Sequence, residues 1–187
     1  MTTTIERQPL AADEHTTALL RTLFTELVQT ERSAEVHSKR EAARYPETPP
    51  ALAMLRVAAH ASAMRPRLHS LSETYGFEIS ETTGSALGNA LSKLRQLFID
   101  KLVQTERSYR ATLVGMRHGV DVVSLIRSVA NKSGAIELAR WSDEWLEQRP
   151  ALVSEVEAAM HWFASNPETA IAPTRTASAV DRVRTER

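Results

Sequence analysis

Two glutamates have identical neighbours in sequence, and each stands in line with an apolar helical stripe. The letters LVQTERS occur at 27–33 and again at 102–108, which places Glu31 and Glu106 at the same point of the repeat. Apolar residues precede each glutamate at steps of three and four, the spacing of one helix face. A carboxylate in an apolar core is costly unless it is paired, protonated or bound to a metal. We therefore expect the two glutamates to share a partner.

Two further segments offer such a partner. His60 stands in a stripe that begins at Val57, and Glu144 stands in a stripe that begins at Trp141. With a rise of about 1.5 Å per residue, Glu31 and His60 lie within roughly one helical turn of the same height. A cluster of three carboxylates and one imidazole would favour iron or manganese. The residues expected to converge, one from each of four helices, are Glu31, His60, Glu106 and Glu144.

The same glutamates have a second interpretation without a metal. Arg56 and Arg140 each precede His60 or Glu144 by one helical turn, on the same face. They are placed to form salt bridges with Glu31 and Glu106 between helices. A third interpretation is that the true apolar stripe of each helix is displaced by one residue from the one assigned here, in which case both glutamates face water. The sequence leaves these three alternatives open.

Four long helices are expected to position these side chains. Ala, Leu, Glu and Arg, all strong helix formers, dominate the 187 residues, whereas Gly occurs only 6 times. Apolar periodicity and the positions of Pro and Gly predict helices over 16–44, 50–75, 85–118 and 135–164. Gly119 is expected to interrupt the third and leave a shorter helix at 120–130. The bundle is expected to span 14–166, with disordered tails at 1–13 and 167–187.

The internal repeat gives this helical chain a topology. Besides LVQTERS, a weaker likeness aligns Arg56 with Arg140, and Arg65–Pro66 with Arg149–Pro150. One amphipathic hairpin cannot bury its apolar stripe alone, but two stacked hairpins can. The predicted fold is an all-α, antiparallel four-helix bundle built from a duplicated helix hairpin, with a short extra helix between helices three and four.

A duplicated helix pair with an inward Glu on its first and third helices resembles the ferritin-like superfamily, especially its small bacterial stress-associated members. The metal motif of that family has one Glu on helices one and three and Glu-x-x-His on helices two and four. Glu31 and Glu106 match the single-Glu positions. The resemblance thereby covers about 16–164 of the chain.

The paired halves of the motif are incomplete. His60 matches the His of the second helix, but Val57 stands where the Glu is expected; Glu144 matches the Glu of the fourth, but Glu147 stands in place of the His. The resemblance therefore implies a non-catalytic ferritin-like bundle without a cofactor that acts through assembly or partner binding, in a stress setting. The alternative that it implies is an iron- or manganese-binding carboxylate protein or oxidoreductase.

The composition excludes several other classes. Lys+Arg and Asp+Glu both total 23, so the basic excess of a nucleic-acid-binding domain is missing. The chain has no Cys, no signal-like N-terminus and no apolar run long enough for a membrane span. We expect a cytoplasmic protein that forms a homo-oligomer or binds a protein partner. His118 is expected to cap the helix end at Gly119, and Trp141 and Trp145 are expected in the core.

Overall fold

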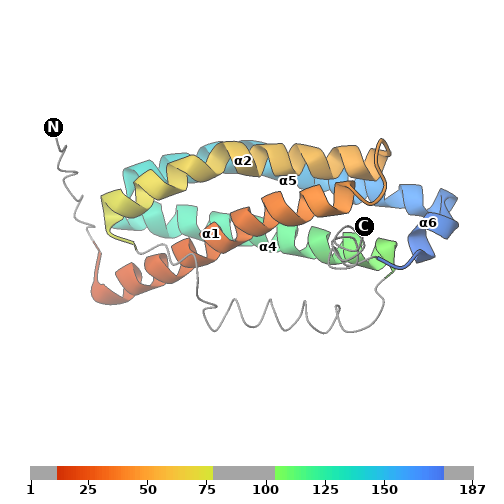
Figure 1. Ribbon diagram of the computed structural model, residues 1–187. Coiled ribbons are helices and arrows are strands. Elements are labelled where there is room, and N and C mark those ends of the chain that lie inside the picture. The colour runs from red at the N-terminus through yellow and green to blue at the C-terminus, as the bar shows by residue number, and fades with distance from the viewer. Residues whose placement is uncertain (1–11, 78–103, 175–187) are drawn as a thin grey trace, which may run out of the picture.

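The computed structural model describes residues 12–77 and 104–174, and this part of the chain consists of helices joined by short turns (Figure 1). Four long helices pack together: α1 (Glu14–Ala42), α2 (Pro49–Tyr75), α4 (Thr105–Ser133) and α5 (Ile136–Ala159). A 3-10 turn, η1 (Met160–Ser165), and a short helix, α6 (Pro167–Ile171), follow α5. The predicted all-α class with four long helices is confirmed.

The first two helices begin and end within two residues of the predicted positions, 16–44 and 50–75. The Asp13 carboxylate accepts a hydrogen bond from the Thr16 backbone N–H at 2.8 Å and caps the start of α1. Thr48 caps α2 in the same way, and Pro49 occupies its first turn, where no amide hydrogen is needed. Gly76 ends α2 with a left-handed φ of 65°.

The third long helix differs from the expected one. α4 continues without a break through Gly119, so the separate helix expected at 120–130 is wrong. A glycine inside a helix costs only about 1 kcal/mol relative to alanine. Gly119 is buried against α1, where an added Cβ would lie 3.9 Å from the Cβ of Thr30. We attribute the continuity of the helix at Gly119 to this packing. The predicted start at 85 lies outside the described residues, but Gln104 is extended, so no single helix covers 85–118.

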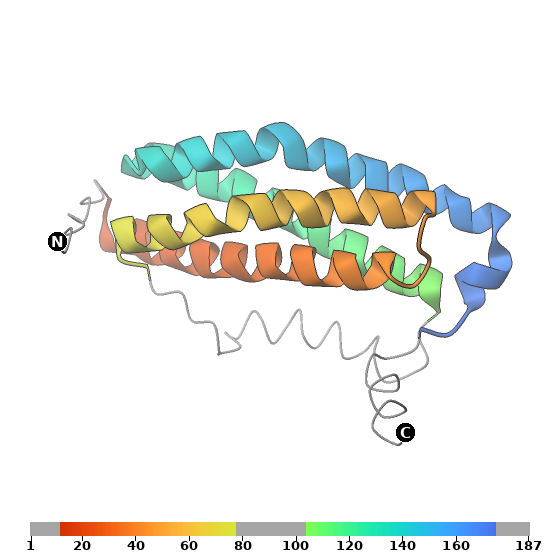
Figure 2. The same cartoon turned by 45° about the horizontal axis from the view of Figure 1, so that its top comes forward.

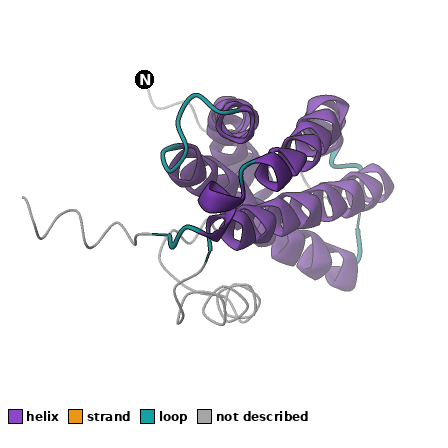
Figure 3. Ribbon diagram, turned by 90° about the vertical axis from the view of Figure 1, so that its right-hand side faces the viewer, coloured by secondary structure: helices purple, strands orange, loops and turns teal. Residues whose placement is uncertain are grey.

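Each long helix contacts two of the others. α1 packs on α2 and α4, and α5 packs on the same two helices, so that the contacts form a ring (Figure 3). The buried apolar side chains form two clusters, one around Phe24 and Trp141 and the other around Met54 and Tyr109. All four helices contribute to both clusters. Trp141 and Trp145 stack in the first of them, which confirms their predicted place in the core.

The chain after α5 returns to the beginning of α4. Figure 2 shows η1 and α6 at the end of the bundle where α4 starts, and both contact α4. The Ala172 carbonyl accepts hydrogen bonds at 2.9 Å from both the backbone N–H and the hydroxyl of Thr105. α6 lies in the segment that the sequence assigned to the C-terminal tail. The rest of that tail, 175–187, and residues 1–11 lie outside the described residues.

The repeated letters LVQTERS do not take the same structure twice. The first copy, 27–33, lies wholly inside α1. In the second copy Gln104 is extended, and α4 begins only at Thr105. Glu31 is therefore in the middle of a helix, whereas Glu106 is in a first turn. The repeat does not produce two equivalent positions, and the origin of the chain by duplication stays a prediction.

Candidate functional site

A buried polar cluster lies between the two apolar clusters. Glu31 of α1, His60 of α2 and Arg149 of α5 are 1%, 8% and 1% exposed, respectively. On α1, Leu27 belongs to the first apolar cluster and Ala34 to the second, with Glu31 between them. Three helices therefore each direct one polar side chain to the same level of the core.

Arg149 joins the other two members of the cluster. Its Nη2 donates a hydrogen bond to Glu31 Oε2 at 2.8 Å and lies 2.9 Å from His60 Nδ1, to which its Nε donates at 3.1 Å. The guanidinium carbon also lies 4.7 Å from the centre of the Trp145 ring, a cation–π contact. Glu31 and His60 thus converge on a single guanidinium group.

The bonds of His60 fix its protonation. Because Nδ1 accepts from Arg149, we assign the proton of the neutral ring to Nε2. Burial, and after it the positive charge of Arg149, lower the pKa of His60 from 6.5 to about 4. The ring is therefore neutral at pH 7. The cluster then holds two charges, the Glu31 carboxylate and the Arg149 guanidinium, which balance each other.

The buried ion pair is held against a large cost of desolvation. Burial raises the pKa of the Glu31 carboxyl above its ordinary value, and the adjoining charge of Arg149 opposes this rise. Burial likewise lowers the pKa of Arg149, while Glu31 opposes that change. Each charge is tolerated because the other lies beside it. The pair is consequently a structural unit whose members depend on each other.

The other two predicted ligands lie elsewhere. Glu106 is in the first turn of α4 and accepts a hydrogen bond from Arg110 at 3.2 Å. Glu144 is 44% exposed in its side chain and pairs with Arg67 of α2. Within the described residues, no three His, Cys, Asp or Glu side chains are grouped so that they could hold a metal ion. The expected convergence of four residues is therefore wrong; only Glu31 and His60 come together.

The predicted salt bridges involve different partners. Arg56 pairs with Glu155 at 2.6 Å, and Arg140 pairs with Glu137 at 3.0 Å. Both arginines are more than half exposed in their side chains and neither contacts a buried glutamate. A salt bridge to Glu31 does exist, but Arg149 supplies it.

The buried side of α5 explains why Arg149 was not predicted. This side runs through Leu138, Trp145, Arg149 and Val153, whereas the stripe taken from the sequence passes through Glu144. One residue is a rotation of about 100° around a helix of 3.6 residues per turn, so an error of one residue exchanges inside for outside. The spacing held a usable signal, since Arg149 follows Trp145 by four residues, in line with the largest apolar side chains.

Two smaller polar contacts connect α1 to α4. His118 was expected to cap a helix end, but α4 does not end there; its Nε2 lies 2.6 Å from Oε1 of Glu26, whose side chain is 10% exposed. Nearer the start of α4, the Ser108 hydroxyl donates to Glu41 at 2.6 Å. Both contacts join a well-buried carboxylate of α1 to a more accessible partner on α4.

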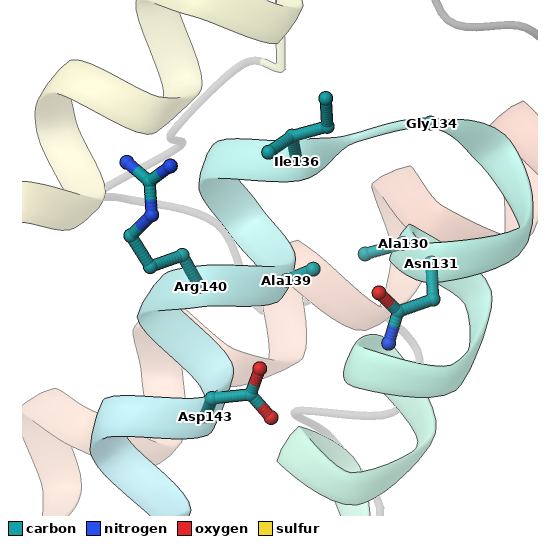
Figure 4. Close-up of a pocket in the computed structure, with 7 residues that line it drawn as sticks. All are labelled: Ala130, Asn131, Gly134, Ile136, Ala139, Arg140 and Asp143. Carbon is teal, nitrogen blue, oxygen red and sulfur yellow. The ribbon is translucent and has the colours of Figure 1, made fainter.

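A surface hollow of about 280 Å³ lies at the turn between α4 and α5, away from the buried cluster (Figure 4). Ala130 and Ala139 form its base, and Asn131 and Asp143 border it. Figure 4 shows the guanidinium of Arg140 pointing away from Asn131, and that guanidinium already pairs with Glu137. The polar groups of the hollow do not point to a common centre, so it has no evident ligand.

Comparison of the chain with protein-family models, with curated proteins and with solved structures gives no match. In the described ranges, no helix combines the length and the apolar character that a membrane crossing requires. The described residues present a buried cluster in which the Arg149 guanidinium occupies the point where Glu31 and His60, two of the four predicted ligands, meet.

Proposed function

We propose that this chain is a ferritin-like, antiparallel four-helix bundle that performs no metal chemistry and acts through assembly or partner binding. The ferritin-like likeness depends on the helix arrangement and on the inward Glu31, and the stress setting depends on that likeness alone.

The order of ion pairs supports the antiparallel arrangement. Arg56 of α2 pairs with Glu155 of α5, and Arg67 pairs with Glu144. An advance of 11 residues along α2 thus corresponds to a retreat of 11 along α5, as expected when neighbouring helices run in opposite directions. The contacts between α1 and α4 follow the same order: Glu41 with Ser108, then Glu26 with His118.

The position of Arg149 is the observation that carries the functional proposal. In a ferritin-like bundle the metal ions lie in the core between carboxylates and imidazoles of facing helices. Here Glu31 and His60 direct their acceptor atoms to one guanidinium, at 2.8 Å and 2.9 Å. A divalent cation at this point would have to displace Arg149 or lie beside its positive charge. Either event would leave a buried charge unbalanced.

Metal binding measured through thermal unfolding tests this proposal. A metal present at 100 times its Kd would stabilise the fold by about 2.7 kcal/mol, which corresponds to roughly 5–10 °C in Tm for a chain of this size. We expect the Tm to stay unchanged when iron, manganese or zinc is added. Elemental analysis of protein purified without chelators should show metal far below one ion per chain.

The alternative, an iron- or manganese-binding carboxylate protein, makes the opposite prediction. A rise of several degrees with sub-stoichiometric iron or manganese, lost in Glu31→Ala, would overturn the non-metal proposal. Glu106→Ala is the matched control, since Glu106 lies apart from the buried cluster and pairs with Arg110. Loss of the metal effect in both variants would instead indicate a site that unites the two glutamates.

A further inference from the structure

The outer face shared by α2 and α5 has an uncharged centre between two ion pairs. From Arg56, residues 59, 63 and 67 follow at steps of three and four along one side of α2, and 144, 148, 151 and 155 do the same on α5. The exposed residues that these steps place between the pairs are small or neutral. The exposed Glu147 also falls between the pairs in sequence, but it lies about 60° around α5 from Glu144, towards the outer edge of the face. We define the α2/α5 face by this uncharged centre, which consists of Ala59, Ala63, Gln148 and Ala151, together with its two bordering ion pairs, Arg56–Glu155 and Arg67–Glu144.

The charges of this face are sorted by helix. Both cations, Arg56 and Arg67, belong to α2, and both anions, Glu144 and Glu155, belong to α5. Their side chains are between 44% and 53% exposed, so the ion pairs are accessible to another surface. The face therefore has one positive edge and one negative edge, with an uncharged strip between the pairs.

Such a face is complementary to a copy of itself in one orientation. A two-fold axis parallel to the helices and lying in the interface places α2 of each copy over α5 of the other. Arg56 then faces Glu155 of the second copy, and Arg67 faces its Glu144. A two-fold axis across the helices would instead place arginine over arginine, and like charges in contact oppose association. The charge pattern thus selects one symmetric arrangement.

The size and shape of the face suit this occupant. α2 has 27 residues and is about 40 Å long. Two adjacent helices of about 10 Å diameter give a strip of roughly 800 Å² over this whole length, the area that each partner contributes to a standard interface. The α2/α5 face, about 16 Å long between its ion pairs, forms the centre of that strip. Ala59, Ala63 and Ala151 allow helices to approach closely. Leu52, which is 49% exposed and one turn before Arg56, supplies an apolar anchor at one end.

We propose that two copies of this chain associate through the α2/α5 face, about a two-fold axis parallel to the helices. This inference rests on the proposed assembly function and names a second copy as the partner. Sedimentation equilibrium of the full chain at roughly 100 µM, well above the Kd of a micromolar interface, should give twice the chain mass of 20.8 kDa. A monomer at this concentration would overturn the inference and leave the metal-free proposal to its own test.

Substitutions at the centre of the face locate the interface. Ala63→Glu places a carboxylate of each copy in the close contact at the uncharged centre and should raise the Kd of the dimer by roughly 100-fold or more. Ala111→Glu, at an exposed alanine of α4, is the matched control and should leave Kd unchanged. Ala151→Glu repeats the test from α5, and circular dichroism establishes that each variant is folded. If these variants all dimerise like the wild type, the copies meet elsewhere and the inference is wrong.

Charge reversal tests whether these four charges lie in the interface. Arg56→Glu/Arg67→Glu makes all four corners of the face acidic, and Glu144→Arg/Glu155→Arg makes them all basic. Each variant alone should be monomeric, because like charges meet in every symmetric pair. Mixed in equal amounts they should form heterodimers, visible in native mass spectrometry as one copy of each. Failure of the mixture to associate, or dimerisation of either variant alone, would contradict the proposed interface.

Discussion

Two ion pairs of the same chemistry lie in opposite surroundings. Glu31 and Arg149 meet at 2.8 Å with both side chains 1% exposed, while Arg117 of α4 and Glu157 of α5 meet at 2.6 Å with side chains 49% and 50% exposed. The distances are alike, but the buried charges have lost their water and the exposed ones have kept much of theirs. Exposed pairs contribute about 0–1 kcal/mol, whereas breaking a buried pair costs about 3–5 kcal/mol. Burial, and not residue type, sets the weight of each pair in the fold.

Removal of the buried cation should have the largest effect. Arg149→Ala leaves the Glu31 carboxylate in the core without its counter-charge and leaves His60 without its donor. We expect the free energy of unfolding in urea to fall by about 3–5 kcal/mol. A loss below about 1 kcal/mol would mean that the buried pair behaves like an exposed one, and the comparison would fail.

A double variant distinguishes the cost of an unpaired buried charge from the cost of lost side-chain volume. Glu31→Leu/Arg149→Met removes both charges and fills the space with apolar side chains of similar length. Because no unpaired charge remains, most of the stability lost in Arg149→Ala should return. If the double variant is as unstable as the single one, the loss arises from packing rather than from an unbalanced charge.

Acid should weaken the buried cluster through His60. The folded ring has a pKa of about 4, against 6.5 for the ordinary group, so between these values the unfolded chain binds the additional proton. Stability contributed by the neutral ring is therefore lost as pH falls from 6.5 to 4, by at most about 3 kcal/mol. Glu31 has the opposite effect on stability. Because its pKa is raised in the folded state, the folded carboxyl binds its proton at a higher pH than the unfolded one, and this protonation favours folding as pH falls.

A non-titrating variant isolates the histidine from the glutamate. His60→Asn keeps an oxygen acceptor towards Arg149 but has no proton to gain in this range. Urea unfolding of both proteins from pH 7 to pH 4 should show the wild type losing stability relative to His60→Asn. Parallel curves would show that His60 contributes no proton linkage to folding.

The helix ends were more predictable than the helix interiors. Pro49 and Gly76 restrict the backbone locally, so the bounds of α2 follow from neighbouring residues alone. Gly119 was expected to end a helix, yet contact with α1 keeps it helical, and that contact joins residues far apart in sequence. Local rules predict where a helix can end, while packing decides whether it does.

The candidate site shows the same limit. Glu31 and His60 were correctly expected at one level, because each stands in line with an apolar stripe on a helix whose bounds were predicted to within two residues. Arg149 was missed because the stripe on α5 was taken one residue out, which turns a helix by about 100°. A charged side chain inside an apolar stripe indicates that a partner exists, but the partner is identified only by the packing of distant helices.

A partly buried pair should fall between the two extremes. Glu26 has a side chain that is 10% exposed, and it contacts His118, which is 36% exposed. His118→Ala removes the partner of the Glu26 carboxylate, which is largely but not fully buried. We expect a loss of about 1–2 kcal/mol in urea unfolding at pH 6. A loss equal to that of Arg149→Ala would show that depth of burial does not rank these contacts.

The exposed pair should give the smallest effect and the clearest response to salt. Arg117→Ala removes the partner of Glu157, but both groups stay in contact with water, so we expect a loss of about 0–1 kcal/mol. At 1 M salt the Debye length falls to about 3 Å, and this small difference from the wild type should vanish. The difference caused by Arg149→Ala should persist at the same salt concentration, since ions do not enter the core. If salt reduced the stability losses of Arg117→Ala and Arg149→Ala equally, Glu31 would be accessible to water and ions. The two pairs would then not differ in their effective burial.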